Sequence, residues 1–314
     1  MAVVARRTGL SPDVVRAWER RHRAVSPART GGNRRLYSDE DVERLLLLKR
    51  AVDAGWPIGH VAPLGDAEIR SLVRSPAGPA TPAAGGGERA AELLEACHGD
   101  VTRLDGAGLE RHLEEAAVEL GRVEVLDSLL VPLFRRIGDE CSAGTMRIAA
   151  EHVASAEAAR FLASLHGAEP PAEDAPAIVV TTPLFQHHAL GALLVAATAR
   201  LEGWRTTYLG PNLPAEEIAA AARRKKASAV ALSVTHPPGD PALAADLERL
   251  GRLLPPSAEL WVGGAGASSH RRVLDAIGGR LLRDLAALRD RLRARPAARP
   301  PGAGPGRGGT RMSR

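Results

Sequence analysis

The feature that most restricts the fold is a short apolar strand followed by a histidine-containing loop and an apolar helix. Residues 177–180 read AIVV, typical of a parallel strand buried on both faces, and residues 189–199 have the composition of a buried helix. The connecting loop, 181–191, is TTPLFQHHALG. In open α/β folds such a loop borders the ligand-binding crevice. The pair His187 and His188 therefore either caps the helix or contributes to a binding site.

The rest of this half of the chain alternates in the same way. Strand-like stretches at 206–209, 229–233 and 260–263 are each followed by a helical pattern, at 215–226, 242–253 and 269–277, and a last helix is expected at 282–293. Alternating strands and helices predict a doubly wound parallel sheet spanning 177–295.

The first 74 residues predict a winged helix-turn-helix. Ser11-Pro12-Asp13 has the order expected at a helix start, with a cap, a proline in the first turn and an acid near the positive end of the dipole. A short helix at 3–7 and a turn at 8–9 precede this second helix. The run GGN at 31–33 predicts a tight hairpin, the wing, and a capped helix follows at 42–52.

Two linkers and a tail separate the remaining units. The segments 75–87 and 167–176 are rich in proline, glycine and alanine, which predicts connections between folded units. Between them, apolar residues at helical spacing predict helices at 88–97, 103–120, 122–142 and 146–166, for which a four-helix bundle is the natural packing. Residues 296–314 are expected to be a disordered basic tail.

Charge and cysteine content limit the possible functions. The first 50 residues hold twelve Arg or Lys against six Asp or Glu, although the whole chain carries only +5. Such concentration is typical of a module that binds a polyanion. Cys97 and Cys141 are too few for a disulfide framework or a closed zinc site, and no apolar run approaches the roughly 20 residues of a membrane span. We therefore expect a cytoplasmic protein in a reducing compartment.

The first 65 residues resemble the DNA-binding domain of MerR-family transcriptional regulators, and the runs RAWERRH and PARTGGNRRLYSDEDVERL resemble its cobalamin-linked light-responsive subgroup, the CarH/LitR type. Arg16 and Trp18 are expected near base edges or the groove wall, with core packing as the alternative for Trp18. Phosphate contacts are expected from Arg20, Arg21, Arg34, Arg35 and Tyr37.

The second half resembles the cobalamin-binding fold, whose pattern is Asp-x-His-x-x-Gly, then Ser-x-Leu, then Gly-Gly. The resemblance implies that His188 is the cobalt ligand, that the Ser233 region lines the pocket of the displaced base, and that glycines let the nucleotide tail approach the backbone. Gln186 replaces the usual carboxylate and Thr235 the usual leucine. The implied cofactor-binding positions here are His188, Gln186, Gly191, Ser233, Thr235, Gly263 and Gly264.

The bundle departs further from the light-responsive relatives. These carry Trp-His and then Glu-His over the upper face of adenosylcobalamin. Here Glu151-His152 keeps the second pair, and Cys141-Ser142 replaces the first. Cys141 either meets the cobalt or another chromophore as a thiolate, or is a structural core cysteine. The implied upper-face residues are Cys141, Glu151 and His152.

Together these features predict a DNA-binding transcriptional regulator, not an enzyme. The leading hypothesis is a repressor whose oligomerisation, as a dimer or tetramer, and binding to double-stranded operator DNA are controlled by a cobalamin-type ligand and by light. One alternative keeps the fold but acts without cobalamin, through a partner or another chromophore. Another, from a different class, is a corrinoid-carrying methyltransferase or mutase subunit, although no nucleophile-base arrangement is evident.

Overall fold

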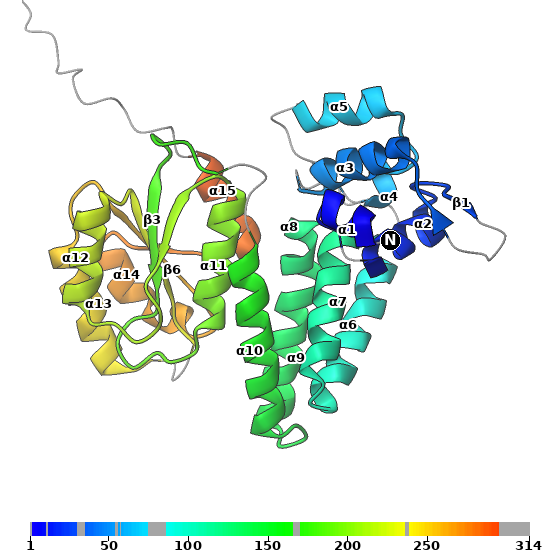
Figure 1. The fold of residues 1–314 in the computed structure, drawn as a ribbon. Coiled ribbons are helices and arrows are strands. Elements are labelled where there is room, and N and C mark those ends of the chain that lie inside the picture. The colour runs from blue at the N-terminus through cyan, green and yellow to red at the C-terminus, as the bar shows by residue number, and fades with distance from the viewer. Residues whose placement is uncertain are drawn as a thin grey trace, which may run out of the picture.

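The computed structural model describes residues 2–10, 12–29, 35–53, 56, 58–74, 86–165, 170–235 and 239–294. Figure 1 shows three units, an N-terminal head, a helical bundle in the middle and an α/β domain beside the bundle. Most of the expected linker 75–87, part of the linker 167–176 and the tail 296–314 lie outside these residues. Within the described ranges, no helix is both long and apolar enough to cross a bilayer.

The head is a winged helix-turn-helix, as predicted. Its elements are α1 (Ala2–Thr8), α2 (Pro12–His22), a hairpin of β1 (Ala28–Arg29) and β2 (Arg35–Leu36), α3 (Asp39–Asp53), α4 (Ile58–Val61) and α5 (Asp66–Arg74). The Ser38 hydroxyl accepts the Asp41 N–H and the Asp41 carboxylate accepts the Ser38 N–H, the reciprocal cap that starts α3. Helix α5 was not predicted from the sequence, although the Glu68 carboxylate caps it by accepting the Gly65 N–H at 2.8 Å.

The bundle contains α6 (Gly86–Thr102), α7 (Gly106–Glu119), a long interrupted helix and α10 (Ile148–Ser164). The third helix was expected to be continuous over 122–142. It instead consists of α8 (Arg122–Glu124), a π-helical stretch (Val125–Leu130) and α9 (Val131–Ser142). Pro132 lacks the N–H that a regular helix would donate to Ser128, which favours a local change in hydrogen-bond register.

The α/β domain is a five-stranded parallel sheet in the order β4-β3-β5-β6-β7. Its strands are β3 (Ala177–Thr181), β4 (Arg205–Tyr208), β5 (Ala229–Ser233), β6 (Glu259–Gly263) and a two-residue β7 (Arg280–Leu281) that the sequence did not predict. Helices α11 (Leu190–Leu201) and α15 (Leu285–Ala294) cover the face toward the bundle. The other face packs against α12 (Ala215–Lys225), α13 (Pro241–Leu253), a 3-10 turn (Ala267–His270) and α14 (Arg271–Ala276).

The bundle and the α/β domain share an apolar core and a partly buried ion pair. Leu193 and Ala197 of α11 are part of the bundle's core cluster. The guanidinium of Arg289, whose residue is only 8% exposed, donates to the carboxylate of Asp127 in the π-helical stretch. The two units are therefore joined by specific contacts as well as by the chain.

We expect Asp127→Asn to lower the free energy of unfolding by about 1 to 3 kcal/mol, because it leaves the buried Arg289 charge without its carboxylate. Glu95→Gln is the matched control, since the side chains of Glu95 and its partner Arg136 are 66% and 37% exposed, and an exposed pair contributes within about 1 kcal/mol. Urea unfolding monitored by circular dichroism measures both. Equal midpoints for the two variants would contradict a stabilising role for Asp127.

Candidate functional site

The histidine pair lies at the carboxyl edge of the sheet, in the loop after β3, an inner strand that lies between β4 and β5. His187 and His188 are both exposed, in the loop that enters α11. Two hydrogen bonds hold the loop immediately before this pair. The Phe185 N–H donates to Asn212 Oδ1 at 2.7 Å, and the Thr182 hydroxyl donates to the Gln186 carbonyl. His188 is therefore presented on an ordered loop at the edge where such folds bind ligands.

Gln186 is bonded to the neighbouring strand. Its side chain is buried, and its Oε1 accepts the backbone N–H of Thr235 at 2.9 Å, with the Thr235 hydroxyl 3.5 Å away. The two departures from the cobalamin pattern are thus in contact with each other. Sequence reasoning considered Gln186 only as a partner of His188 and missed this bond, which joins the β3 loop to the end of β5.

Ser233 and Gly191 form the closest contact at this edge. The Ser233 hydroxyl is buried and has no hydrogen-bond partner within the described part of the chain. A Cβ placed on Gly191 would lie 2.2 Å from that hydroxyl oxygen and 3.2 Å from the Ser233 Cβ, so any larger residue would displace the Ser233 side chain. Because an unpaired buried hydroxyl is costly, a partner that enters from outside the chain would be favoured at Ser233.

Glycines are also required at the end of β6. Gly264 has φ +102°, and a Cβ there would lie 2.3 Å from the Val234 carbonyl oxygen. Gly266, which sequence reasoning did not single out, would place a Cβ 2.6 Å from the Thr235 carbonyl oxygen. A Cβ on Gly263 would meet the Leu282 carbonyl oxygen at 3.3 Å. The ends of β5 and β6 therefore approach so closely that side chains are excluded. The sequence signal for Gly266 was its place two residues after the Gly263-Gly264 pair, in the run GGAG.

The expected upper-face residues lie on the bundle at the same end of the molecule. Arg200 near the end of α11 donates to the Leu162 and Ala163 carbonyls near the end of α10, so these helices run parallel and their N-terminal ends lie on one side. Glu151 and His152 are in the first turns of α10. The Glu151 carboxylate accepts the Ser155 hydroxyl at 2.6 Å, whereas His152 is 75% exposed.

Cys141 borders the bundle core near Glu151. It is half-buried, and burial, followed by the nearby Glu151 carboxylate, raises the pKa of its thiol. The neighbouring Ser142 hydroxyl donates to the Gly138 carbonyl at 2.8 Å within the same helix. Cys97 is completely buried, and burial, with a smaller contribution from Asp100, raises its pKa to about 12. Neither thiol is predominantly thiolate near neutral pH.

These environments predict that Cys141 reacts faster than Cys97 in the folded protein. A maleimide added at pH 7 should label Cys141 within minutes and Cys97 only after unfolding in urea, because a thiol must be both deprotonated and accessible to react. Mass spectrometry of the digested protein measures each site, and Cys141→Ser is the control. Rapid labelling of Cys97 in the folded chain would contradict the buried position.

The second candidate site is the exposed face of α2. Arg16 and Arg20 are exposed and four residues apart, so they lie on one side of this helix. Trp18 is completely buried in the core of the head. The expectation that Trp18 lies near base edges is therefore wrong for this structure, and the core-packing alternative applies.

Glu19 connects α2 to the wing. Its carboxylate accepts the Arg35 Nε–H at 2.7 and 2.9 Å and the Tyr37 hydroxyl at 3.1 Å. Burial, followed by the hydrogen bond to Glu19, raises the pKa of Tyr37 to about 12. Arg35 and Tyr37 thus orient the wing against α2. Sequence reasoning missed Glu19 because its partners are 16 and 18 residues away. Arg34 lies outside the described residues.

Arg21 points toward the bundle. Its guanidinium donates to the carboxylates of Glu115 and Glu119 on α7, at 2.7 Å for Glu115. The structure therefore separates Arg21 from Arg16 and Arg20, although all were expected to contact DNA.

Comparisons with known proteins agree with all three units. The MerR HTH family regulatory protein model matches residues 1–67, and two B12 binding domain models match residues 93–165 and 176–279. The HTH-type transcriptional repressor CarH of Myxococcus xanthus is 30% identical over 275 residues, 88% of this chain and 91% of CarH. The repressor CarA of the same organism is 29% identical over 276 residues, 88% of this chain and 89% of CarA.

A solved structure is also similar, that of the monomethylamine corrinoid protein of Methanosarcina barkeri. It has a TM-score of 0.49 and 19% identity, and covers 65% of this chain and 99% of its own. The identity to CarH over nearly the full chain, together with the winged helix-turn-helix and the two B12 binding domains, settles the family. The chain belongs to the CarH type of MerR-family regulators, which are cobalamin-binding, DNA-binding transcriptional regulators and not enzymes.

Proposed function

We propose that the protein represses transcription in the cytoplasm as an oligomer that holds operator DNA in one cofactor state and releases it in another, with adenosylcobalamin as the cofactor form and light as the trigger. The folded units would be 1–74, 88–166 and 177–295. CarH and CarA, both named as transcriptional repressors, support the sign of regulation. Oligomerisation would add affinity by joining DNA-binding heads without new contacts.

The observation that carries the cofactor assignment is the buried Ser233 hydroxyl, which packs against Gly191 and has no hydrogen-bond partner among the described residues. A hydroxyl in this position could donate to an acceptor nitrogen of a base inserted at the sheet edge. The exposed His188, three residues before Gly191, could supply an imidazole nitrogen to the cobalt from the same edge. Bound cobalamin would supply a cobalt that accepts this axial ligand. The residues present therefore fit the lower side of the cofactor.

A second candidate function, regulation without cobalamin, is favoured by the contacts of Gln186. Its amide oxygen accepts the Thr235 N–H, so it is already engaged, and the carboxylate that would raise the basicity of His188 is absent. Cys141-Ser142 in place of the upper-face Trp-His pair supports the same alternative. In that case the protein would switch through a partner or another chromophore.

Cofactor retention tests the proposal. The full chain is incubated in the dark with adenosylcobalamin or hydroxocobalamin, passed through gel filtration, and examined by absorption and light scattering before and after illumination. We expect about one cobalamin per chain, a larger assembly with adenosylcobalamin in the dark, and a smaller one after light. His188→Ala should weaken retention by about 10-fold or more, because even the loss of a residue that bonds to a metal ligand typically costs about that much in metal affinity.

His187→Ala is the matched control and should retain the cofactor like the native chain, because it changes the adjacent exposed imidazole. If neither cobalamin form remained with the native protein, the cobalamin-independent function would replace this proposal. If the cofactor were retained but the mass of the protein assembly did not change upon illumination, light would no longer be part of the proposal. Control by the ligand would remain.

A further inference from the structure

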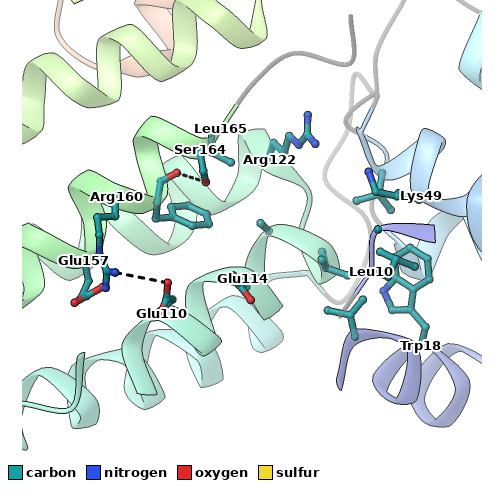
Figure 2. A pocket seen from close by; sticks show the side chains of 16 residues that line it. Leu10, Trp18, Lys49, Glu110, Glu114, Arg122, Glu157, Arg160, Ser164 and Leu165 are labelled. Carbon is teal, nitrogen blue, oxygen red and sulfur yellow. Dashed lines mark hydrogen bonds and ion pairs between the residues drawn. The ribbon is translucent and has the colours of Figure 1, made fainter. Parts of the chain in front are cut away.

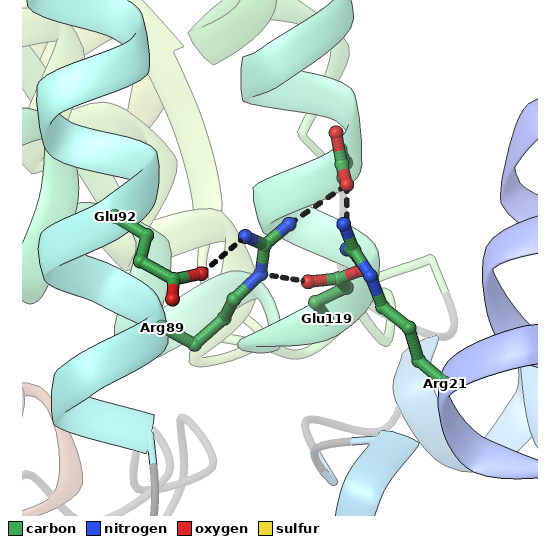
Figure 3. Close-up of polar contacts among 5 residues, drawn as sticks. Arg21, Arg89, Glu92 and Glu119 are labelled. Carbon is green, nitrogen blue, oxygen red and sulfur yellow. Dashed lines mark hydrogen bonds and ion pairs between the residues drawn. The ribbon is translucent and has the colours of Figure 1, made fainter.

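Four charged side chains join the head to the bundle. Figure 3 shows Arg21 of α2 reaching Glu119 of α7 beside Arg89 of α6. Arg89 also donates to Glu115 at 2.8 Å and to Glu92 at 2.7 Å, and Arg21 donates to Glu115 at 2.7 Å. Glu119 is only 7% exposed. We call Arg21, Arg89, Glu115 and Glu119 the latch.

The latch lies on the side of α2 that faces away from its exposed arginines. Val14, Trp18 and Arg21 are four and three residues apart and share one face of the helix. Arg16 follows Val14 by two residues, and Arg20 follows Trp18 by two. Each arginine therefore lies about 200° around the helix axis from that apolar residue. The face carrying Arg16 and Arg20 therefore remains open when Arg21 is bound to the bundle.

Apolar packing between head and bundle is incomplete. Val118 of α7 packs against the core of the head. Val118 also lines a partly open cleft of about 480 Å³, which has Leu10 and Trp18 on the head side and Glu114 and Phe161 on the bundle side (Figure 2). A cleft in place of close packing gives fewer dispersion contacts at that point. The latch adds directed charged contacts to this limited packing and to the contact between α4 and α7, although the Arg21 side chain is 42% exposed.

We propose that Arg21 is a positioning residue that fixes the orientation of the DNA-binding head on the bundle, and that it does not contact DNA phosphates. The carboxylates of Glu115 and Glu119 take the place that phosphate oxygens would otherwise take. With the head fixed, the face carrying Arg16 and Arg20 and the wing held by Glu19 point in one direction relative to the bundle. The proposal rests on the DNA-binding role of the head, and does not require cobalamin.

Energy transfer in the full apo chain measures the orientation directly. Dyes are attached to the native Cys141 on the bundle and to an Arg70→Cys site on the head, whose native side chain is 61% exposed. Arg21→Ala and the double variant Glu115→Gln/Glu119→Gln should both broaden and shift the transfer efficiency to the same extent. Combining all three changes should add nothing, because they break one interaction. Glu92→Gln, which removes a partner of Arg89 but none of Arg21, should leave the efficiency unchanged.

DNA binding by the same unlabelled variants separates positioning from direct contact. The probe is a duplex from upstream of the protein's own gene. We expect Arg21→Ala and the double glutamine variant to weaken binding equally, by about tenfold, with the salt dependence of native protein retained, because loss of a phosphate contact would reduce that slope by about 1. Circular dichroism confirms that each variant is folded.

Three results would overturn the proposal. A smaller salt slope in Arg21→Ala alone would make Arg21 a phosphate contact. Tighter DNA binding by the double glutamine variant would make the glutamates an inhibitory clamp. Unchanged energy transfer in both latch variants would mean that other contacts orient the head.

Discussion

Replacing Arg16 and Arg20 together by alanine is expected to weaken binding to operator DNA by about 100-fold or more. Both side chains are exposed on the face of α2 turned away from the bundle, where a recognition helix would meet the major groove. Loss of an arginine at a base or phosphate typically costs about 1 to 3 kcal/mol, and the two changes should combine. Fluorescence anisotropy at fixed salt measures the affinity, and its variation with salt reports how many phosphate contacts are lost.

Arg70→Ala is the control for net charge, because it removes one exposed positive charge from α5 of the same head. It should change affinity by no more than a few-fold. If Arg16→Ala/Arg20→Ala bound operator DNA as tightly as Arg70→Ala, the surface of the head that contacts DNA would have to lie elsewhere. If one of the two single variants lost affinity for operator DNA but not for a duplex of unrelated sequence, the arginine replaced in that variant would be the one that contacts bases.

Gly264→Ala is expected to destabilise the α/β domain by roughly 3 to 5 kcal/mol and to abolish cobalamin retention. Alanine is strained at φ +102°, and its Cβ would lie 2.3 Å from the Val234 carbonyl oxygen and 3.0 Å from the Val234 backbone nitrogen. Backbone atoms cannot move aside as a side chain can, so the ends of β5 and β6 would have to separate. Ser233 and Thr235 flank Val234, and they would move with it.

Gly203→Ala is the control that introduces backbone strain without a steric clash. Gly203 also has positive φ, +78°, but nothing lies within 4 Å of the position its Cβ would take. It should therefore cost only about 1 to 2 kcal/mol and leave retention intact. Urea unfolding of both variants, together with gel filtration after loading with cobalamin, provides the comparison. Equal losses in the two variants would mean that the close approach at Gly264 has no effect of its own.

Sequence reasoning predicted the elements whose signals are local. The cap at Ser38, the apolar run of β3 and the helical periodicity of the bundle each act over a few residues, and all three units form as expected. The two-residue β7 carries no periodic signal, and it forms because β6 offers an open edge. The π-helical stretch escaped prediction because its apolar pattern continues that of an ordinary helix.

The residues of the candidate sites could be predicted from the sequence, but the hydrogen bonds and ion pairs between them could not. His188, Ser233 and Gly264 do come to one edge of the sheet, because parallel strands end together. The bond between Gln186 and Thr235 spans 49 residues, and that between Arg21 and Glu119 spans 98. No local pattern encodes such pairs. Arg21 is the clearest case, since the neighbouring Arg16 and Arg20 gave it the same expectation although it lies about 100° around the helix axis from Arg20 and about 140° from Arg16.

The π-helical stretch at 125–130 has a consequence for the far end of its helix. A π turn holds one more residue than an α turn, so everything after it is rotated by about 100° relative to an uninterrupted helix. Leu133 and Ile137 are buried and Cys141 borders the core in that rotated phase. Deleting one residue from the stretch would restore regular winding and carry Cys141 around the helix axis. The orientation of Cys141 toward the bundle core is thus set by a change in helical winding more than ten residues away.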